Sequence, residues 1–415
     1  MKKISITLSF IIMLACMMIF SSCGNNLKTV DFNGKLGVWV FGSKQTGTIS
    51  ITGNLYGYSK RSLENAKEEI ITTLREMNEE LNTVDKNSLI YEFNNYGINE
   101  NEEFDSQKKF YISEYLYHML TVAKELHQSP EGIIEKNGED FNANKYFNPA
   151  IYPLMELWDL DSESLFYGAP RTSVPTTEDI DTVLPYTDFS KVHYGEDENG
   201  FYMTKELRQI KLDFGGQAKG YGADITVEIC KKYKIKGASF SIGGNAYVFN
   251  KKPLTDGTTK MWEIGVNMPI EHKQSAFCAL RLENTSLVTS GDYNRFFMFN
   301  DIKYAHILDP YTGLPVNIER KTVDEQMVDT NISDGLVSVT IINQNSELSD
   351  IYAKIVMLLG MENGIKYLLQ NNLNGILISH KQYAAVGEFE QFDINGANGY
   401  QDYDAYVYNG VTYSF

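Results

Sequence analysis

The stretch best suited to chemistry runs from Asp213 to Asp224 and reads Asp-Phe-Gly-Gly-Gln-Ala-Lys-Gly-Tyr-Gly-Ala-Asp. An apolar, strand-like approach leads into the pair Gly215-Gly216, and a helical pattern follows. Glycines let a ligand approach the backbone closely, and the unpaired N–H groups at a helix start attract anions. Lys219 would add a positive charge. The stretch therefore predicts a phosphate site, while a glycine pair before a helix is equally compatible with an ordinary tight turn.

His306 is the second candidate, and it is one of six histidines in the chain. Its imidazole is suited to work as a base near neutral pH. It stands within a strand pattern, where a hydrogen-bonded histidine of the core is the plainer interpretation from these residues alone. The sequence contains no CxxC pair and no histidine-rich ligand spacing, so it gives no support to a structural zinc site.

Amphipathic helices must position these residues. Ser62 is a good N-cap, and apolar residues recur behind it at steps of three and four as far as Leu81, which predicts a helix. A second helix is predicted to start near Ser113. A third covers residues 350–359, and a short helix follows near residues 364–369.

Segments with a β pattern alternate with these helices, and no repeat or clean linker separates them. The sequence therefore predicts the α+β class, with a single interleaved domain of mixed and antiparallel sheets and packed helices. The predicted strands are 36–41, 48–55, 238–242, 247–250, 262–266, 277–282, 287–289, 337–342, 375–379 and 383–386. Residues 85–110 and 129–146 are predicted as loops, and residues 400–415 as an added edge strand.

The composition limits the possible partners and the chemistry of the cysteines. The formal net charge is −17, and 43% of the residues are hydrophobic, which is ample for a full core. No basic stripe is present to neutralise phosphates, so no nucleic-acid partner is expected. Of the four cysteines, Cys230 and Cys278 fall in apolar patterns, where buried free thiols are expected rather than a disulfide.

The N-terminus is similar to the signal peptide of a bacterial lipoprotein. Lys2 and Lys3 precede an apolar run that ends at Phe20, and two small serines then stand directly before Cys23. A positive start, an apolar middle and small residues at the cleavage point are the parts of a secretory signal.

We expect residues 1–22 to be the signal peptide and Cys23 to be the lipidated mature N-terminus, with residues 23–36 as a tether. The protein would then be extracytoplasmic and lipid-anchored to the bacterial cell membrane. Cys16 is a weaker alternative for the lipidated cysteine. The alternative to lipidation is an uncleaved anchor that spans the membrane, because the apolar run is nearly long enough to do so.

Further motifs follow the glycine-rich stretch in an order that is specific to one family. They are Ser241-Ile-Gly-Gly-Asn245, Thr289-Ser-Gly-Asp-Tyr293, Tyr304-Ala-His-Ile-Leu-Asp-Pro-Tyr-Thr-Gly-Leu-Pro315 and Leu348-Ser-Asp350, with the aromatic–proline block Phe147–Trp158 upstream. Together they resemble the signature of the FAD:protein FMN transferase (ApbE-type) family. The resemblance covers roughly residues 37–390, which are expected to form an ApbE-like flavin transferase domain. Residues 391–415 lie beyond it as a C-terminal extension.

The resemblance implies transfer of FMN from FAD to a threonine of an exported electron-transfer protein, with release of AMP. It implies FAD as substrate and Mg²⁺ as metal. His306 matches the histidine that activates the acceptor threonine, and Asp292 is expected to be a second catalytic residue. The residues expected to contact FAD are Gly215, Gly216, Gln217, Ala218, Lys219, Gly220, Gly244, Ser290, Gly291 and Asp292.

The expected metal ligands include one departure from the family. The resemblance assigns the metal to Asp350, to a backbone oxygen near Ala218, and to an oxygen four residues after Asp350, where the family commonly has threonine. This chain has Lys354 there. Positions i and i+4 share a helix face, so the lysine points where the ligand would. It either occupies the place of the cation or carries its charge away from the site while water completes the magnesium shell.

Two other functions use the same residues. With water as the nucleophile, the site would act as an FAD pyrophosphatase. With a degraded metal site, the chain would be a non-catalytic FAD-binding lipoprotein. A lipoprotein for adhesion or solute binding would leave the ordered motifs unexplained.

Overall fold

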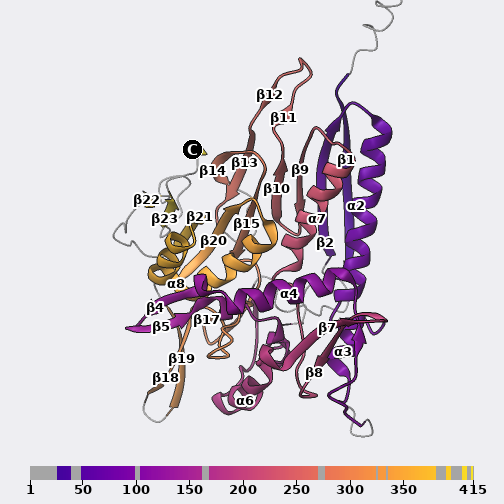
Figure 1. Cartoon of the computed structure of the whole chain (residues 1–415). Helices are drawn as coiled ribbons and strands as arrows, with labels where there is room; N and C mark the ends of the chain where they lie inside the picture. Colours follow the sequence, from indigo (N-terminus) through magenta and orange to yellow (C-terminus); the bar gives the residue numbers. More distant parts are fainter. Residues whose placement is uncertain are drawn as a thin grey trace, which may run out of the picture.

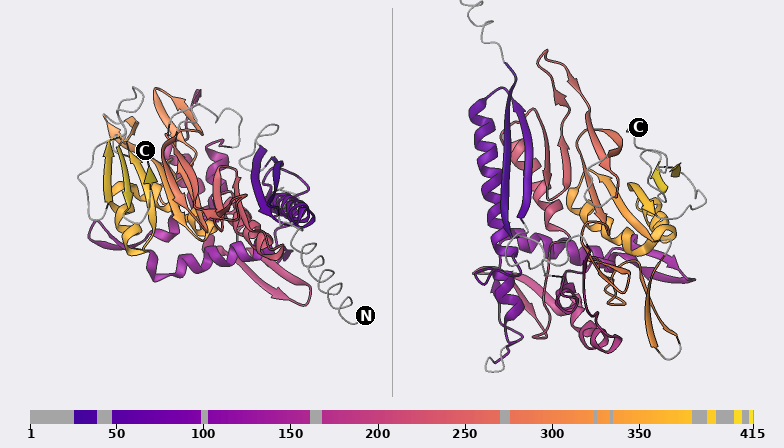
Figure 2. Two further views of the ribbon diagram at one scale, coloured as in Figure 1. Left: turned by 90° about the horizontal axis from the view of Figure 1, so that it is seen from above. Right: turned by 180° about the vertical axis from the view of Figure 1, so that it is seen from behind.

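The computed structural model describes residues 26–38, 48–98, 103–160, 168–269, 276–323, 326–332, 335–379, 389–393, 404–408 and 413–414. A large sheet forms the centre of this part of the chain, helices cover one of its faces, and smaller sheets pack around it (Figure 1, Figure 2). Helices and strands are interleaved along the chain, although among the described residues those from 237 to 343 contribute strands with no helix between them. The predicted interleaved α+β class is confirmed.

Nine strands of the described residues form the central sheet, in the order β1-β2-β9-β10-β15-β20-β21-β23-β22, and each neighbouring pair is antiparallel. The bounds are β1 Lys28–Val38, β2 Thr48–Gly57, β9 Gly237–Ile242, β10 Asn245–Phe249, β15 Thr285–Gly291, β20 Leu336–Asn343, β21 Asn374–Ser379, β22 Phe389–Asp393 and β23 Asp404–Tyr408. Strands from the start, middle and end of the chain are neighbours. The sheet therefore unites most of the chain in a single unit.

Both faces of the sheet are buried, because successive side chains of a strand point to opposite faces. On β20, Ile341 belongs to the core under the helices, whereas Ile342 belongs to a second core. That second core lies under the strands β13 (Trp262–Asn267) and β14 (Ala276–Leu282), and Trp262 and Leu280 contribute to it. Coverage on both sides explains why seven consecutive residues of β20 are buried.

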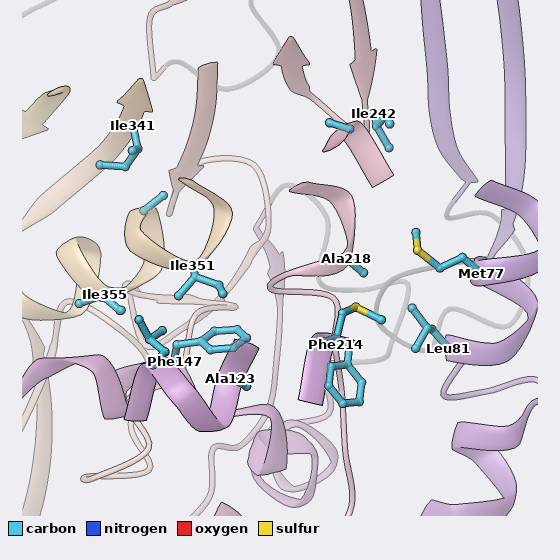
Figure 3. Packing of buried hydrophobic residues seen from close by; sticks show 14 of the residues in the cluster. Met77, Leu81, Ala123, Phe147, Phe214, Ala218, Ile242, Ile341, Ile351 and Ile355 are labelled. Carbon is cyan, nitrogen blue, oxygen red and sulfur yellow. The ribbon is translucent and has the colours of Figure 1, made fainter. Parts of the chain in front are cut away.

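The helices α2 (Lys60–Leu81), α7 (Ala218–Lys232) and α8 (Ser346–Gln370) lie across one face of the sheet, and α4 (Glu114–Gln128) runs across their ends (Figure 1). Figure 3 shows part of the core between them, which includes Phe147, Phe214, Ala218 and Ile351. The two predicted segments 350–359 and 364–369 belong to one helix, α8, which is broken at Gly360 with φ of 72°.

The remaining elements surround this core. The smaller sheets are β3 (Phe110–Tyr111) with β8 (Gly200–Lys205) and β7 (Val192–Asp197), β4 (Ile133–Lys136) with β5 (Glu139–Asn142), β6 (Ala169–Pro170) with β16 (Phe296–Phe299) and β17 (Ile302–Ala305), β11 (Lys252–Pro253) with β12 (Thr259–Lys260), β18 (Ile318–Val323) with β19 (Gln326–Asn331), and β24 (Tyr413–Ser414) on β14. The remaining α-helices of the described residues are α3 (Leu89–Asn95), α5 (Tyr152–Leu157) and α6 (Thr177–Val183), and short 3₁₀ turns cover 130–132, 143–146, 149–151, 184–187 and 189–191. The block Phe147–Trp158 is the bent, packed segment that its prolines predict.

Serine caps explain where two of the helices begin. Ser113 accepts a hydrogen bond from the backbone N–H of Leu116 at 3.2 Å, so the predicted start of α4 is confirmed. The expected cap of α2 at Ser62 is wrong, because the N-cap is Ser59, which accepts from the Ser62 N–H at 3.3 Å. The Ser62 hydroxyl instead donates to the carbonyl of Tyr233 at the end of α7, at 2.6 Å.

Three segments expected to lack regular structure contain strands or helices. Residues 28–36 of the expected tether belong to β1, which pairs along β2 and buries Val30 and Phe32. The sequence did not reveal this strand, because a few apolar residues alternating with polar ones give only a weak strand pattern. The expected loop 85–110 contains α3, and the expected loop 129–146 contains the β4–β5 hairpin.

The C-terminal prediction is only partly correct. Residues 404–408 form a strand, but β23 lies between β21 and β22 rather than at the edge of the sheet. The strand predicted at 383–386 and the signal segment with Cys16 and Cys23 lie outside the described residues. Within the described part, no helix is long and apolar enough to cross a membrane. Cys230 and Cys278 are buried free thiols, as expected.

Candidate active site

Asp350 is the centre of a polar cluster beneath the helices. Its side chain lies on α8 and is only 1% exposed. One carboxylate oxygen accepts from Lys354 Nζ at 2.6 Å. The other accepts from the N–H of Gly220 at 3.1 Å and from Asn245 Nδ2 at 2.9 Å, and it lies 3.5 Å from Lys219 Nζ. Three hydrogen-bond donors and a second lysine, from three separate elements, therefore converge on one carboxylate.

The local sequence explains how these elements meet. Gly243 and Gly244, with φ of 56° and 94°, form the two-residue turn between β9 and β10, and positive φ at both positions is what such a turn requires. This turn brings Asn245 to Asp350. Asp224 of α7 accepts the first N–H groups of α8, from Ser346 at 2.9 Å and from Glu347 at 2.8 Å. This contact fixes the start of α8 against α7.

The cluster affects the pKa values of both Asp350 and Lys354. Burial opposes ionisation of Asp350, but Lys219 and Lys354 outweigh it and hold the pKa of Asp350 below its usual value. Burial lowers the pKa of Lys354 to about 8, against the opposing effect of Asp350. Near pH 7 the lysine is therefore mainly an ammonium group paired with a carboxylate.

Four of the backbone N–H groups in the glycine-rich loop donate to acceptors within the chain. The Gly215 N–H donates to Asp213 Oδ1 at 2.9 Å, and the Gly220 N–H donates to Asp350. The N–H groups of Gln217 and Ala218 both donate to the carbonyl of Phe214, at 3.0 and 2.9 Å. Four of the six backbone amides of Gly215–Gly220 therefore already have acceptors within the chain, and contact of this loop with a phosphate stays a prediction.

A small cavity of about 80 Å³ opens beside this loop. Its walls combine apolar side chains, among them Phe147 and Leu358, with the polar residues Asp213, His306 and Lys354. The full lining is Tyr146, Phe147, Asn148, Ile151, Met155, Asp213, Gly216, His306, Ile307, Leu308, Lys354 and Leu358. An apolar pocket with a few convergent polar groups is the usual form of a small-molecule site.

His306 lies in the wall of this cavity as a base of defined tautomer. Its Nδ1 is 3.1 Å from the backbone carbonyl of Arg295. A carbonyl only accepts hydrogen bonds, so Nδ1 carries the proton and Nε2 carries the lone pair. Burial, together with the positive charge of Arg295, lowers the pKa of His306 well below its usual value. The ring is therefore neutral near pH 7 and can accept a proton.

Three functional candidates were missed by the sequence reasoning. Asp213 lines the cavity, and burial raises its pKa, while Lys219, Arg295 and Lys354 oppose this effect. Arg295 acts electrostatically on both His306 and Asp213. Asn245 binds Asp350. For two of them the sequence offered a signal, which was their position: Asp213 opens the glycine-rich stretch, and Asn245 ends the Gly-Gly-Asn motif.

Two of the residues expected to contact FAD, Gln217 and Ala218, have side chains that are buried inside the protein. Gln217 is fully buried, and its Nε2 donates to the carbonyl of Met119 at 3.1 Å and to Glu347 at 2.7 Å. Ala218 is also fully buried at the start of α7. Gly244 lies in the β9–β10 turn, with open space where a Cβ would be.

The Ser290–Asp292 segment lies elsewhere in the described structure, outside the residues that line the cavity. Ser290 and Gly291 end the strand β15. The Asp292 carboxylate accepts from Lys303 Nζ at 2.8 Å and from Asn317 Nδ2 at 3.0 Å. The Asp292 side chain therefore ties the end of β15 to neighbouring segments, and its catalytic role stays a prediction.

The residues present do not fit the expected magnesium ion. Mg²⁺ is bound through oxygen ligands at near-octahedral positions. Here the side chain four residues after Asp350 is an ammonium group, which donates hydrogen bonds and repels a cation. The second oxygen of Asp350 already accepts two hydrogen bonds beside Lys219.

Comparison with known proteins places this geometry in context. The ApbE family model matches residues 46–377. The FAD:protein FMN transferase of Vibrio cholerae is 24% identical over 91% of this chain and 97% of its own length, and that of Haemophilus influenzae is 25% identical over 91% and 93%. The FAD:protein FMN transferase of Klebsiella pneumoniae is 30% identical, but the match covers 54% of this chain and 60% of that protein.

Solved structures share the fold. The flavin transferase ApbE from Vibrio cholerae superposes with a TM-score of 0.63, at 19% identity over 92% of this chain and 98% of that chain. The apo form of the Pseudomonas stutzeri flavinyl transferase ApbE gives a TM-score of 0.62, at 19% identity over 86% and 93%. The strands and helices that carry Asp350 and His306 thus belong to a known architecture.

Proposed function

The chain belongs to the ApbE family, and on this premise we propose that it is an FAD:protein FMN transferase. It moves FMN from FAD to the hydroxyl of a threonine in an acceptor protein and releases AMP. The named relatives support the flavin substrate and the protein acceptor. The threonine is what the family resemblance implies, and AMP is the leaving group when the bond between the FMN phosphorus and the bridging oxygen breaks.

The reaction balances with groups present at the site. The threonine Oγ attacks the phosphorus of the FMN half, and the bond from that phosphorus to the bridging oxygen breaks. AMP leaves with the bridging oxygen, and a phosphodiester-like link joins FMN to the protein. His306 Nε2 takes the hydroxyl proton. Lys219 and Lys354 offset the negative charge that builds on the phosphate oxygens.

The observation that carries this proposal is the pairing of a neutral base with a cation in one cavity. His306 and Lys354 both line it, and the imidazole tautomer leaves the lone pair on Nε2. The expected magnesium ion forms no part of the proposal, because one of its ligand positions holds Lys354 in an ion pair with Asp350.

The proposal includes the compartment. Cys23 would carry the lipid anchor, the domain would lie outside the cytoplasmic membrane, and the acceptor would be an exported electron-transfer protein. This part rests on the sequence around Cys23, which is outside the described residues. An acceptor on the same side of the membrane is the only kind that such an enzyme could reach.

The test incubates the purified full chain with FAD and a candidate acceptor that has an accessible threonine. A mass gain of the acceptor equal to FMN, with AMP in solution, is the expected result. An acceptor with that threonine changed to valine is the control and should stay unlabelled. AMP and FMN released without labelling would identify an FAD pyrophosphatase instead, and recovery of intact bound FAD would identify a non-catalytic flavin-binding protein.

A further inference from the structure

We propose that the Lys354 ammonium group takes the place of a divalent cation in this site, so that the protein binds the pyrophosphate of FAD and transfers FMN without bound metal. The inference rests on the proposed function, since it names how that same site neutralises its substrate. It is argued from four features of the described residues: the pairing of Lys354, the positive charge of the cavity, the occupied loop amides, and the space left by Gly216.

Lys354 is held at the place where a cation would bind. Its Nζ donates to Asp350 Oδ1 at 2.6 Å and to the Asp350 backbone carbonyl at 3.0 Å. Both acceptors are oxygens of the kind that coordinate magnesium. A metal ion would have to displace this ammonium group, and the displaced lysine would then lie beside a dication in a buried site, where like charges repel strongly.

The charges around the cavity already favour an anion. Lys219, Lys354 and Arg295 are positive, and Asp350 and Asp213 are the carboxylates that interact with them. Burial raises the pKa of Asp213, which reduces its negative charge further. The cluster is therefore net positive before any metal binds, and this suits the two negative charges of a pyrophosphate.

The positive charge must come from side chains in this protein. The N–H groups of Gly215, Gln217, Ala218 and Gly220 donate to acceptors within the chain, as described above. A helix start whose amides are occupied attracts an anion less than one with free amides. Lys354 and Lys219 supply the donors that the loop does not.

Because Gly216 has no side chain, it leaves room for the stem of Lys354 beside the loop. A Cβ at position 216 would lie 3.1 Å from Lys354 Cε, 3.2 Å from Lys354 Cδ and 3.2 Å from Phe147 Cε2. The stem of the lysine is thus packed between the loop and an aromatic ring, and its direction is fixed by this contact as well as by Asp350. This packing argues against a lysine that carries its charge away from the site.

The experiment measures FAD binding and FMN transfer separately, each in EDTA and in millimolar MgCl₂, with the metal content of the protein determined by mass spectrometry. The wild-type chain should hold no stoichiometric divalent metal and should bind FAD with the same Kd in both conditions. Lys354→Met should weaken FAD binding by about 10- to 100-fold, the range for losing a charged hydrogen bond. Lys366→Met is the matched control, because Lys366 also pairs at i−4 on α8, with Glu362, but on an exposed surface.

Lys354→Thr gives the sharpest result, because it restores an oxygen beside Asp350. This variant should bind FAD weakly in EDTA and recover with magnesium, so that the metal becomes necessary only when the lysine is absent. If Asp350 left without its partner prevents folding, the double variant Asp350→Asn with Lys354→Met removes both charges, and it should fold and bind FAD weakly in either condition.

The outcomes separate the inference from the proposed function. Wild-type protein that loses FAD binding in EDTA and regains it with magnesium overturns the inference while leaving the transferase intact. Metal-independent FAD binding without transfer to any acceptor overturns the transferase and, with it, metal-free transfer, but supports the role of Lys354 in binding the pyrophosphate. No binding of FAD in either condition overturns both.

Discussion

Gly220 of α7 lies directly against the backbone of Ser346, where α8 begins. A Cβ at position 220 would collide with the Ser346 carbonyl oxygen and would lie 2.7 Å from the Glu347 Cα. Glycine is therefore needed here for close packing of the two helices, and only through that packing does the Gly220 N–H reach Asp350. Gly220, which the sequence assigns to a predicted phosphate loop, thus allows α7 and α8 to pack closely.

Gly220→Ala should lower the free energy of unfolding by about 1–3 kcal/mol, the usual cost of overpacking a filled interior. Chemical denaturation followed by circular dichroism measures it. Gly34→Ala is the control, because a Cβ at position 34 meets nothing within 4 Å. Equal stability of the two variants would contradict the close contact between α7 and α8.

His306→Gln should slow FMN transfer by about 10²- to 10⁴-fold, the span usual for a general base, with FAD binding retained. Single-turnover labelling of the acceptor, together with an FAD titration, separates the two effects. His193→Gln is the control, since His193 of β7 pairs with Glu206 and both side chains are exposed. A transfer rate unchanged by the loss of the imidazole would make His306 a structural residue of the cavity wall.

His118 should make stability depend on pH. Its Nε2 lies 2.8 Å from Glu347 of α8, and this hydrogen bond raises the pKa of His118 above its usual value. The stability it adds is therefore fully present below the unfolded pKa of about 6.5 and is lost as the pH rises through the higher folded pKa.

Thermal unfolding at about pH 6 and about pH 8 tests this, because the two values bracket the ordinary titration of histidine. The Tm of the wild type should fall more between them than that of His118→Gln, which keeps a hydrogen-bond donor but does not titrate. Charges from Asp224 and Glu125 also act on His118 and remain in both proteins, so the difference isolates the imidazole. Parallel pH profiles would show that the His118–Glu347 pair contributes nothing to stability.

Cys23→Ala should release the protein from the membrane, because the lipid on Cys23 is the proposed anchor and no helix of the described residues is long and apolar enough to cross a membrane. Fractionation of bacterial cells followed by an alkaline wash of the membranes measures it. Cys16→Ala is the control and should remain membrane-bound. Full retention of the Cys23 variant after the wash would favour a spanning N-terminal anchor.

The sequence determined those features whose signal is local. Ser113 and the apolar spacing behind it predicted α4, and the apolar run around Ile341 predicted β20. The ordered motifs also identified the family. Lys354 could be recognised as a departure four residues after Asp350, because spacing on a helix fixes which side chains share a face.

Only the tertiary structure decided how those residues are used. The N–H group of Gly220 looks available in the sequence, but Asp350 occupies it once α7 and α8 are packed. Asp292 looks catalytic beside a glycine, yet Lys303 and Asn317 bind its carboxylate. The physical reason is the same in each case. A hydrogen-bonding group in a buried site must find a partner, and residues distant in the sequence supply it only after the chain has folded.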